Sequence, residues 1–366
     1  MAVQTAHDLG RAAREQFLKD LNDIDSPATA QMMQQYRIAM ARIASTMARV
    51  LKGGDAHSAA MLAGHETDIR IAMIQGRASY ILGELDRFGA QGAAIMRDLP
   101  KQAVTLGMAH ATDRLSAVSG AMVSPNPRRV AAMAARMSDG TPQRAYLDQF
   151  ATRVTQNAVD SMTQGVIMGN HPDVILRDLS SQMSGDGANL ATFVRSNVMG
   201  AARDGLTATM QDNSDVCTGW LWNCAEDEST CEVCWAMNGT QHDVSEELDS
   251  HPNCRCIQDP TTQSYSDIVG AGGDASGGDL TDSSAQAFNP DDRFRSTLSE
   301  AQQSNVLGPG KFSLFQDGKI TLADLVTKTP PGPWGPGKRA TTLTELQAKG
   351  IGQAPVIDQV ARGQRK

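Results

Sequence analysis

All six cysteines of this 366-residue chain lie between Cys217 and Cys256. Disulfides that stabilise a whole domain are usually distributed along it, whereas metal-binding cysteines are clustered. Cys231 and Cys234 are separated by two residues, which is the spacing at which a tight turn presents two thiolates to one tetrahedral ion. The clustering therefore predicts a local metal site. A pair of disulfides is the alternative, and a reducing cytoplasm disfavours it.

We expect the metal to be zinc and to serve structure rather than catalysis. Tetrahedral zinc needs four ligands. The segment offers five candidates, which are Cys231, Cys234, His251, Cys254 and Cys256. We predict that the first three bind together with either Cys254 or Cys256, because spacing alone does not choose between these two. A structural zinc contributes on the order of 10 kcal/mol to folding, which suits a segment with few apolar residues.

The sequence around the cluster predicts no catalytic residues. A zinc deaminase would carry a His-x-Glu element upstream of its cysteines, but the nearest upstream histidine here lies in His171-Pro172-Asp173. We interpret His242 as a surface residue of a turn. Cys217 and Cys224 flank the Trp220–Trp222 run and are interpreted as buried small apolar residues of a strand or turn. The chain is therefore predicted not to be an enzyme.

Charge argues against broad nucleic-acid binding. The whole chain has a formal charge of -8 and a pI near 5.4, whereas binding to a phosphate backbone needs clustered Lys and Arg. Between residues 217 and 259, Arg255 is the one basic side chain. The same segment has nine acidic side chains: Glu226, Asp227, Glu228, Glu232, Asp243, Glu246, Glu247, Asp249 and Asp259. We interpret these carboxylates as a solvated face.

The rest of the chain predicts a mainly α fold, in which a long helical N-terminal region precedes a small α+β zinc-binding module and a short C-terminal region. Aromatic residues make up only 4% of the chain while methionine occurs 18 times, a composition that favours helices over sheets. Apolar residues recur at steps of three and four from Met32 to Val50, with Ser26 and Pro27 predicted as N-cap and first helical residue. Separate helices are predicted from Pro172 and over 190–210.

Four regions are expected along the chain: a helical domain over 1–215, the zinc-binding module over 216–260, a flexible linker over 261–291 and a small C-terminal region over 292–366. The linker is rich in Gly, Ser, Asp and Thr. In the last region we expect a short helix near 296–305, and a Pro/Gly run over 329–337 that is extended and forms no ladder. No apolar run approaches the roughly 20 residues that span a bilayer, so no membrane association is predicted.

The string from Asp227 to Gly239, followed by His251-Pro-Asn-Cys254-Arg-Cys256, resembles the signature of the phage head morphogenesis family. This family comprises minor head proteins of tailed phages and prophages, of the Mu F-like and SPP1 gp7-like type. The Asp, Thr, Cys-x-x-Cys, Gly and HPNCRC elements occur in the family's order. The chain differs from the family pattern at Ser229, where the family usually shows Arg, and at Arg195-Ser-Asn197, where it shows Arg-x-Glu.

The resemblance implies a minor structural protein that is associated with the portal and acts in capsid assembly and in DNA packaging or delivery. Its implied partners are the portal protein and the major capsid protein, with packaged DNA as a further candidate. It would lie in the virion, in the capsid interior or at the portal vertex, and in the host cytoplasm during assembly. Apart from the resemblance, a further reading from the residues is DNA contact through Arg128-Arg129, Lys338-Arg339 or the tail residues Arg362, Arg365 and Lys366, with a solvated terminus as the alternative.

The alternative function is a head module fused to a toxin or transferase activity in residues 292–366. This segment contains neither His nor Cys, which disfavours that reading.

Overall fold

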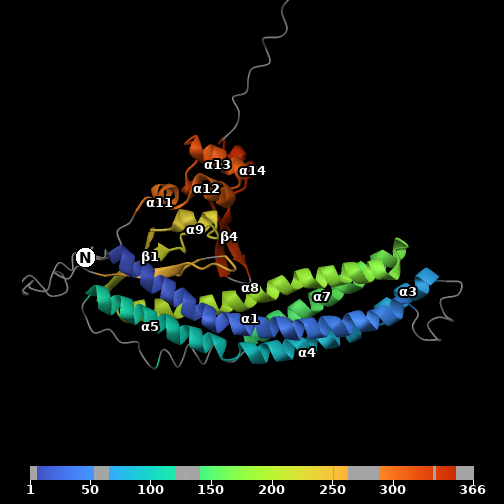
Figure 1. Ribbon diagram of the computed structural model, residues 1–366. Coiled ribbons are helices and arrows are strands. Elements are labelled where there is room, and N and C mark those ends of the chain that lie inside the picture. The colour runs from blue at the N-terminus through green and yellow to red at the C-terminus, as the bar shows by residue number, and fades with distance from the viewer. Residues whose placement is uncertain are drawn as a thin grey trace, which may run out of the picture. The chain divides into compact units, whose positions relative to one another are not determined.

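The computed structural model describes residues 6–52, 66–119, 128, 141–249, 251–262, 288–332 and 335–351. Within these residues the fold is mainly α, with long N-terminal helices followed by a small strand-containing region, which confirms the predicted fold class (Figure 1). Most of the predicted linker, residues 263–287, and the basic tail lie outside the described residues. In the part of the chain that is described, no helix is both long enough and apolar enough to cross a membrane.

The N-terminal helices are α1 (Ala6–Lys52), α3 (Glu66–Gln75), α4 (Ala78–Met96), α5 (Leu99–Ser119), α7 (Thr141–Ile167) and α8 (Pro172–Asp212). They are followed by β1 (Cys217–Asn223), α9 (Glu232–Met237), β2 (Gln241–His242) and β3 (Ile257–Thr262). The C-terminal elements are α11 (Pro290–Thr297), α12 (Glu300–Leu307), α13 (Pro309–Gln316), the 3-10 turn η1 (Leu322–Leu325), β4 (Val326–Gly332), β5 (Gly335–Ala340) and α14 (Leu343–Ala348).

These elements form two compact units. We call the first the cysteine unit; it contains the described residues up to Glu15, those of α5 from Ala109 onward, and those from Leu206 onward. The second, the helical unit, contains the described residues from Gln16 to Met108 and those between Asn126 and Gly205. Helices α1, α5 and α8 therefore contribute residues to both units.

Helix α1 is longer than the sequence pattern predicted. The prediction that it begins at Ser26 and Pro27 is wrong, because Pro27 lies inside a 47-residue helix. Proline in a helix interior removes one backbone hydrogen bond. The buried stripe nevertheless continues on both sides of it, with Leu21 at 2% exposure and Met32 at 0%. Burial of this continuous apolar face outweighs the lost bond.

Helix α8 is likewise continuous, so the prediction of two separate helices from Pro172 and over 190–210 is wrong. The helix contains Gly185 and Gly187, and its buried stripe runs past them from Leu179 to Leu190. Gly187 lies against α1, where an added Cβ would be 3.0 Å from Met33 Cε. The small residue is used for close packing rather than for ending the helix.

An aromatic cluster forms the core of the helical unit. Tyr36 of α1 packs on Phe88 of α4 and Phe150 of α7, with ring centroids 5.3 and 5.6 Å apart. The Tyr36 hydroxyl donates a hydrogen bond to the carbonyl oxygen of Met183 in α8, at 3.0 Å. The cluster thus joins four helices, which run alongside one another in Figure 1. A further connection is the ion pair between Arg195 of α8 and the buried carboxylate of Asp25, at 2.9 Å.

Two glycines allow α5 and α8 to approach closely in the helical unit. An added Cβ on Gly107 would overlap the carbonyl oxygen of Ala202, and one on Gly205 would overlap the carbonyl oxygen of Val104. Each glycine therefore lies directly against the backbone of the opposite helix.

A small antiparallel sheet with the order β2-β1-β3 lies in the cysteine unit. Trp220 of β1 pairs with His242 of β2, and Leu221 pairs with Asp259 of β3. Two arginines from distant helices reach this sheet. Arg14 of α1 donates hydrogen bonds to the side chain of Asn223 and the carbonyl oxygen of Cys224. Arg114 of α5 forms a buried ion pair with Asp259, at 2.9 Å.

The C-terminal elements differ from prediction in two places. Instead of one helix near 296–305 there are two, because Ser299 forms the N-cap and capping box that begins α12. The prediction that the Pro/Gly run forms no ladder is wrong, since β4 and β5 pair as an antiparallel hairpin with an irregularity between Thr329 and Gly332. Proline is tolerated there because it occupies strand positions next to that irregularity.

Candidate metal centre

The first arm of the cluster is the start of α9. Cys231 is the N-cap of this helix, with extended backbone angles, and its Sγ accepts a hydrogen bond from the backbone N–H of Cys234 at 3.4 Å. A side-chain acceptor at the N-cap satisfies one of the backbone donors that a helix start leaves unpaired. The Cys-x-x-Cys spacing thus places both sulfurs on the same side of the first turn of α9.

The second arm is the turn that precedes β3. His251 begins it, and its carbonyl oxygen accepts a hydrogen bond from the backbone N–H of Cys254 at 3.2 Å. Asn253 has a φ of 64°, in the left-handed region that asparagine tolerates better than most residues. The backbone N–H of Cys256 donates to Cys254 Sγ at 3.5 Å.

The two arms bring all five predicted donor residues together. His251 Nε2 lies 3.1 Å from Cys231 Sγ and 3.2 Å from Cys234 Sγ. Cys234 Sγ lies 3.6 Å from Cys254 Sγ. The donor atoms form two overlapping groups, Cys231–Cys234–His251 and Cys234–Cys254–Cys256, and in each group all atoms lie within 4.8 Å of one another. The cluster can therefore hold a metal ion.

The donor atoms fit a tetrahedral site for a thiophilic ion. Zinc bonds of about 2.3 Å to sulfur and about 2.0 Å to nitrogen would separate two sulfurs by roughly 3.8 Å and sulfur from nitrogen by roughly 3.5 Å. The observed separations of 3.1 to 3.6 Å are close to these values. Thiolate and imidazole ligands favour zinc or a similar ion over magnesium or calcium, which prefer oxygen.

The pKa values within the cluster reflect shared protons between sulfur and imidazole. Hydrogen bonding from Cys234, together with the nearby His251, lowers the pKa of Cys231 to about 5. The same contact with Cys231 raises the pKa of His251 to about 9. Hydrogen bonding to Cys231 and Cys254 raises the pKa of Cys234, and burial raises that of Cys256. A thiolate beside an imidazolium is thus favoured here, and metal binding must displace the histidine proton.

An ion pair that the sequence did not reveal joins the two arms. Arg255, which lies between two of the candidate ligands, donates to both carboxylate oxygens of Asp227, at 2.6 and 2.8 Å. Thr230 donates to the same carboxylate at 2.9 Å, just before Cys231. Burial alone would raise the pKa of Asp227, but the Arg255 and Thr230 hydrogen bonds outweigh it and lower that pKa. The shared presence of Asp227 and Arg255 in the signature was the available signal.

The other two cysteines lie outside the donor groups. Cys217 begins β1 and Cys224 follows its last residue, and both are buried, as predicted. Burial raises the pKa of Cys217 to about 11, so its thiol stays protonated at neutral pH.

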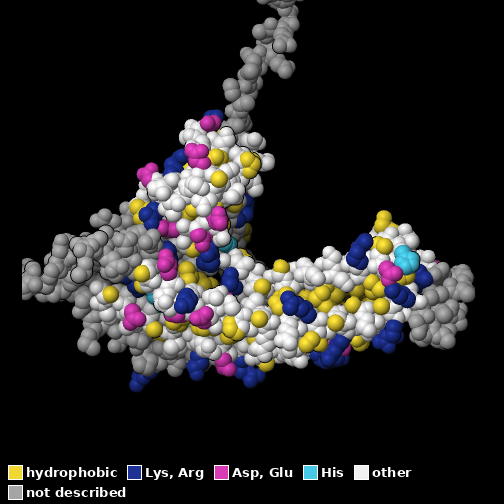
Figure 2. All heavy atoms as spheres, viewed as in Figure 1, with side chains coloured by type: hydrophobic (Ala, Val, Ile, Leu, Met, Phe, Trp, Pro, Cys, Tyr) yellow, Lys and Arg dark blue, Asp and Glu magenta, His cyan; other side chains and the backbone are white. Residues whose placement is uncertain are grey.

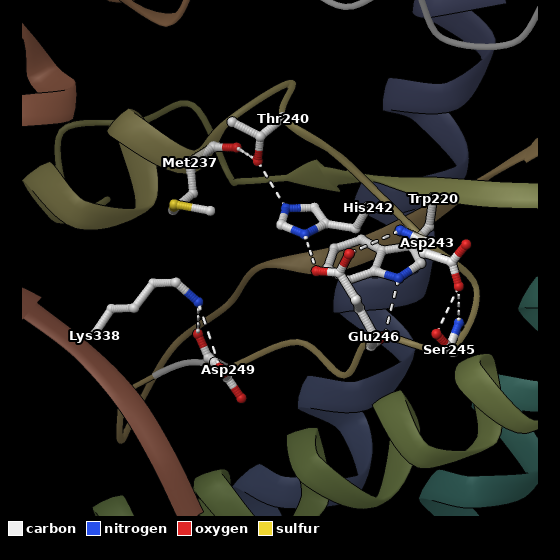
Figure 3. Close-up of polar contacts among 9 residues, drawn as sticks. All are labelled: Trp220, Met237, Thr240, His242, Asp243, Ser245, Glu246, Asp249 and Lys338. Atoms are coloured by element: carbon white, nitrogen blue, oxygen red, sulfur yellow. Dashed lines mark hydrogen bonds and ion pairs between the residues drawn. The ribbon is translucent and has the colours of Figure 1, made fainter. Parts of the chain in front are cut away.

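His242 is not a surface residue of a turn, and that prediction is wrong. It lies in β2 with its ring stacked on Trp220, the centroids 4.2 Å apart (Figure 3). Its Nε2 is 2.9 Å from the hydroxyl of Thr240 and its Nδ1 is 3.1 Å from a carboxylate oxygen of Glu246. The pairing of β1 with β2 places the imidazole of His242 on the apolar face of the Trp220 indole. The two residues are far apart in the sequence, so the local pattern does not predict this contact.

Several acidic residues form ion pairs rather than a solvated face, so that interpretation is wrong for them. Glu226 pairs with Arg293, Glu232 with Lys311 and Asp259 with Arg114, and the three carboxylate side chains are only 7%, 9% and 8% exposed. Figure 2 shows acidic and basic side chains intermixed over the visible face of the cysteine unit. The basic partners of these three carboxylates all lie outside residues 217–259.

Two of the candidate DNA-contacting residues are engaged within the protein. Lys338 of β5 has an 11% exposed side chain and lies 3.8 Å from the carboxylate of Asp249 (Figure 3). Arg339 forms hydrogen bonds with both carboxylate oxygens of Glu345. Arg129 and the basic tail lie outside the described residues.

Comparison with protein families matches residues 156–258 to the family described as Phage Mu protein F like protein. The match begins within α7, ends within β3 and includes all five candidate ligands. Comparisons with curated proteins and with solved structures produced no match. Over residues 156–258 the chain is thus similar to the Phage Mu protein F like proteins, which confirms the predicted resemblance to the phage head morphogenesis family.

Proposed function

We propose that this chain is a minor structural protein of a tailed phage or prophage head, associated with the portal and acting in capsid assembly and DNA packaging or delivery. The observation that carries the proposal is the family match over residues 156–258, which spans the whole cysteine cluster. Portal and major capsid proteins are the proposed partners, and the virion is the proposed location.

The proposed role of the cluster is to hold one structural zinc ion. We propose Cys231, Cys234, His251 and Cys254 as its ligands. Cys254 is preferred over Cys256 because its sulfur lies 3.6 Å from Cys234 and accepts a backbone N–H. When bound, the ion would tie the start of α9 to the turn before β3. Four protein ligands leave no open coordination position, which fits a structural rather than a catalytic site.

Elemental analysis of the purified chain tests the zinc site. We expect one zinc per chain in the wild type and in Cys217→Ser, which alters a buried cysteine outside the donor groups. Cys231→Ser, His251→Ala and Cys254→Ser should lose the ion, while Cys256→Ser should keep it. Absence of metal from native protein, or thiols found oxidised by mass spectrometry, would contradict the site.

Assembled particles test the structural role. Purified heads should contain the chain, and chemical cross-linking should connect it to the portal protein. A chain that is absent from mature and immature heads alike is not a head protein, whatever metal it binds.

A further inference from the structure

Helix α9 is too short to be stable by itself. It has six residues, whereas isolated helices shorter than about 12 to 15 residues are marginal in water. Its N-terminal end carries two of the proposed ligands, Cys231 and Cys234. The remaining residues of α9 therefore need stabilising contacts from other elements.

The other side chains of α9 contact the C-terminal elements. Trp235 is fully buried and packs edge-on against Phe294 of α11, with ring centroids 5.1 Å apart. Glu232, the residue after Cys231, forms an ion pair of 2.5 Å with Lys311 of α13, whose side chain is 13% exposed. Helix α9 also contacts η1 and β5. One short helix therefore joins the metal cluster to most of the C-terminal region.

A basic residue of the C-terminal elements also contacts the chain just before each arm of the cluster. Before the first arm, Glu226 accepts hydrogen bonds from Arg293 at 2.6 and 3.0 Å. Before the second arm, the carbonyl oxygen of Asp249 accepts a hydrogen bond from Lys338 at 3.3 Å, two residues from His251 (Figure 3). Residues 288–351 thus bind the same two segments that the metal would join.

We infer that α9, held by the metal, is the docking platform for residues 288–351, so that metal binding and docking of this C-terminal segment strengthen each other. The inference rests on the proposed zinc site and adds a regulatory consequence to it. Coupling of two binding equilibria is reciprocal. The factor by which metal binding strengthens docking of the C-terminal segment therefore equals the factor by which docking raises the metal affinity.

The experiment uses the full chain. Hydrogen exchange measured by mass spectrometry compares metal-loaded protein with protein stripped by a chelator at neutral pH. We expect exchange over 290–316 to rise at least several-fold on stripping, while α4 and α7 in the helical unit stay protected. Unchanged exchange over 290–316 in protein shown to have lost its metal would overturn the coupling.

A variant tests the reverse direction with every proposed ligand intact. Lys311→Gln should increase exchange over 290–316 and speed metal transfer to a chromogenic chelator by several-fold. Lys319→Gln is the matched control, because Lys319 forms an exposed ion pair with Asp317 rather than with a residue of α9. If Lys311→Gln released its metal at the wild-type rate, the inference would be refuted, but the proposed zinc site would not be. If native protein holds no metal, the proposed site fails first, and the elemental analysis reports that separately.

Discussion

Arg255 illustrates how one side chain can stabilise a candidate metal cluster without being one of its donor residues. It lies between Cys254 and Cys256, and its guanidinium holds Asp227, four residues before Cys231. The guanidinium geometry matches a carboxylate in a bidentate manner, which fixes direction as well as distance. The two arms are thereby held in register by an interaction separate from the donor atoms.

At the residue scale, Glu226→Gln tests the pairing with Arg293. Hydrogen bonding from Arg293 and Asn238 outweighs the effect of burial and lowers the pKa of Glu226 below its ordinary value near 4.5. A carboxyl with a lowered folded-state pKa contributes stability above its ordinary pKa, and this is lost as pH falls through the folded-state pKa. We expect Glu226→Gln to reduce the unfolding free energy by about 2 kcal/mol at pH 7.

The difference in unfolding free energy between Glu226→Gln and the wild type should narrow as pH falls below about 4.5, since wild-type Glu226 then becomes neutral, as glutamine is. Denaturant unfolding at several pH values measures this. Glu247→Gln is the control, because Glu247 is exposed. A difference that stays constant between pH 7 and pH 3 would contradict the assigned role of the charge.

The cysteines and the histidine that lie together in the cluster were predictable while their charged neighbours were not, for a physical reason. Donor residues on one turn are close in sequence, so spacing alone groups Cys231 with Cys234. The partners of Glu226 and Glu232 are 67 and 79 residues away along the chain. Local pattern carries no information on such pairs. His242 was misread for the same reason, because its burial depends on the pairing of β2 with β1.

At the element scale, apolar periodicity predicted where helices lie better than where they end. The buried stripes of α1 and α8 pass through Pro27 and past Gly185, at positions where intrinsic propensity predicts an interruption. Propensity terms of about 1 to 3 kcal/mol per residue are smaller than the burial of a long apolar face. The β4–β5 hairpin shows the same limit: its prolines led to the prediction that no strand pairing occurs, whereas the two strands pair in the structure.

The close approach of α5 and α8 gives an element-scale prediction. Gly107→Ala should destabilise the helical unit by about 1 to 3 kcal/mol, because the new methyl group overlaps the backbone of Ala202 and forces the helices apart. Gly83→Ala in α4 is the matched control, since nothing lies within 4 Å of its added Cβ. That variant should gain up to about 1 kcal/mol from helix propensity.

Denaturant unfolding followed by far-ultraviolet circular dichroism compares the two glycine variants. Equal effects of Gly107→Ala and Gly83→Ala would mean that the α5–α8 approach is looser than described.

At the scale of the whole molecule, the cysteine unit is assembled from distant parts of the chain. Arg14 and Arg114 reach Asn223 and Asp259 across more than a hundred residues. The predicted regions, with helices first and the cysteines later, follow the order of the sequence. That order could not reveal that early helical turns and late strands belong to one compact unit, because such contacts have no local signature.

Arg114→Gln tests this long-range assembly. Removing one partner of a buried ion pair costs about 3 to 5 kcal/mol, since the remaining charge is left uncompensated. The side chains of Arg114 and Asp259 are 10% and 8% exposed. We expect faster hydrogen exchange in β1 and β3, with α4 and α7 unaffected.

Arg177→Gln is the control for this variant, because its ion pair with Asp178 is on the surface, with 74% and 50% exposure, and exposed pairs contribute under about 1 kcal/mol. Faster exchange of α4 and α7 in Arg114→Gln would indicate that the two units do not unfold separately.

The composition of the two units also sets the order in which a nascent chain can mature. All residues of the helical unit have been synthesised once residue 205 is made, and domains generally fold as units during synthesis. Arg14 is translated far earlier than its partners Asn223 and Cys224, so the first turns of α1 must wait for them. The cysteine unit is therefore the last to close, and newly made chains stay vulnerable to proteases there until translation has passed the final strands.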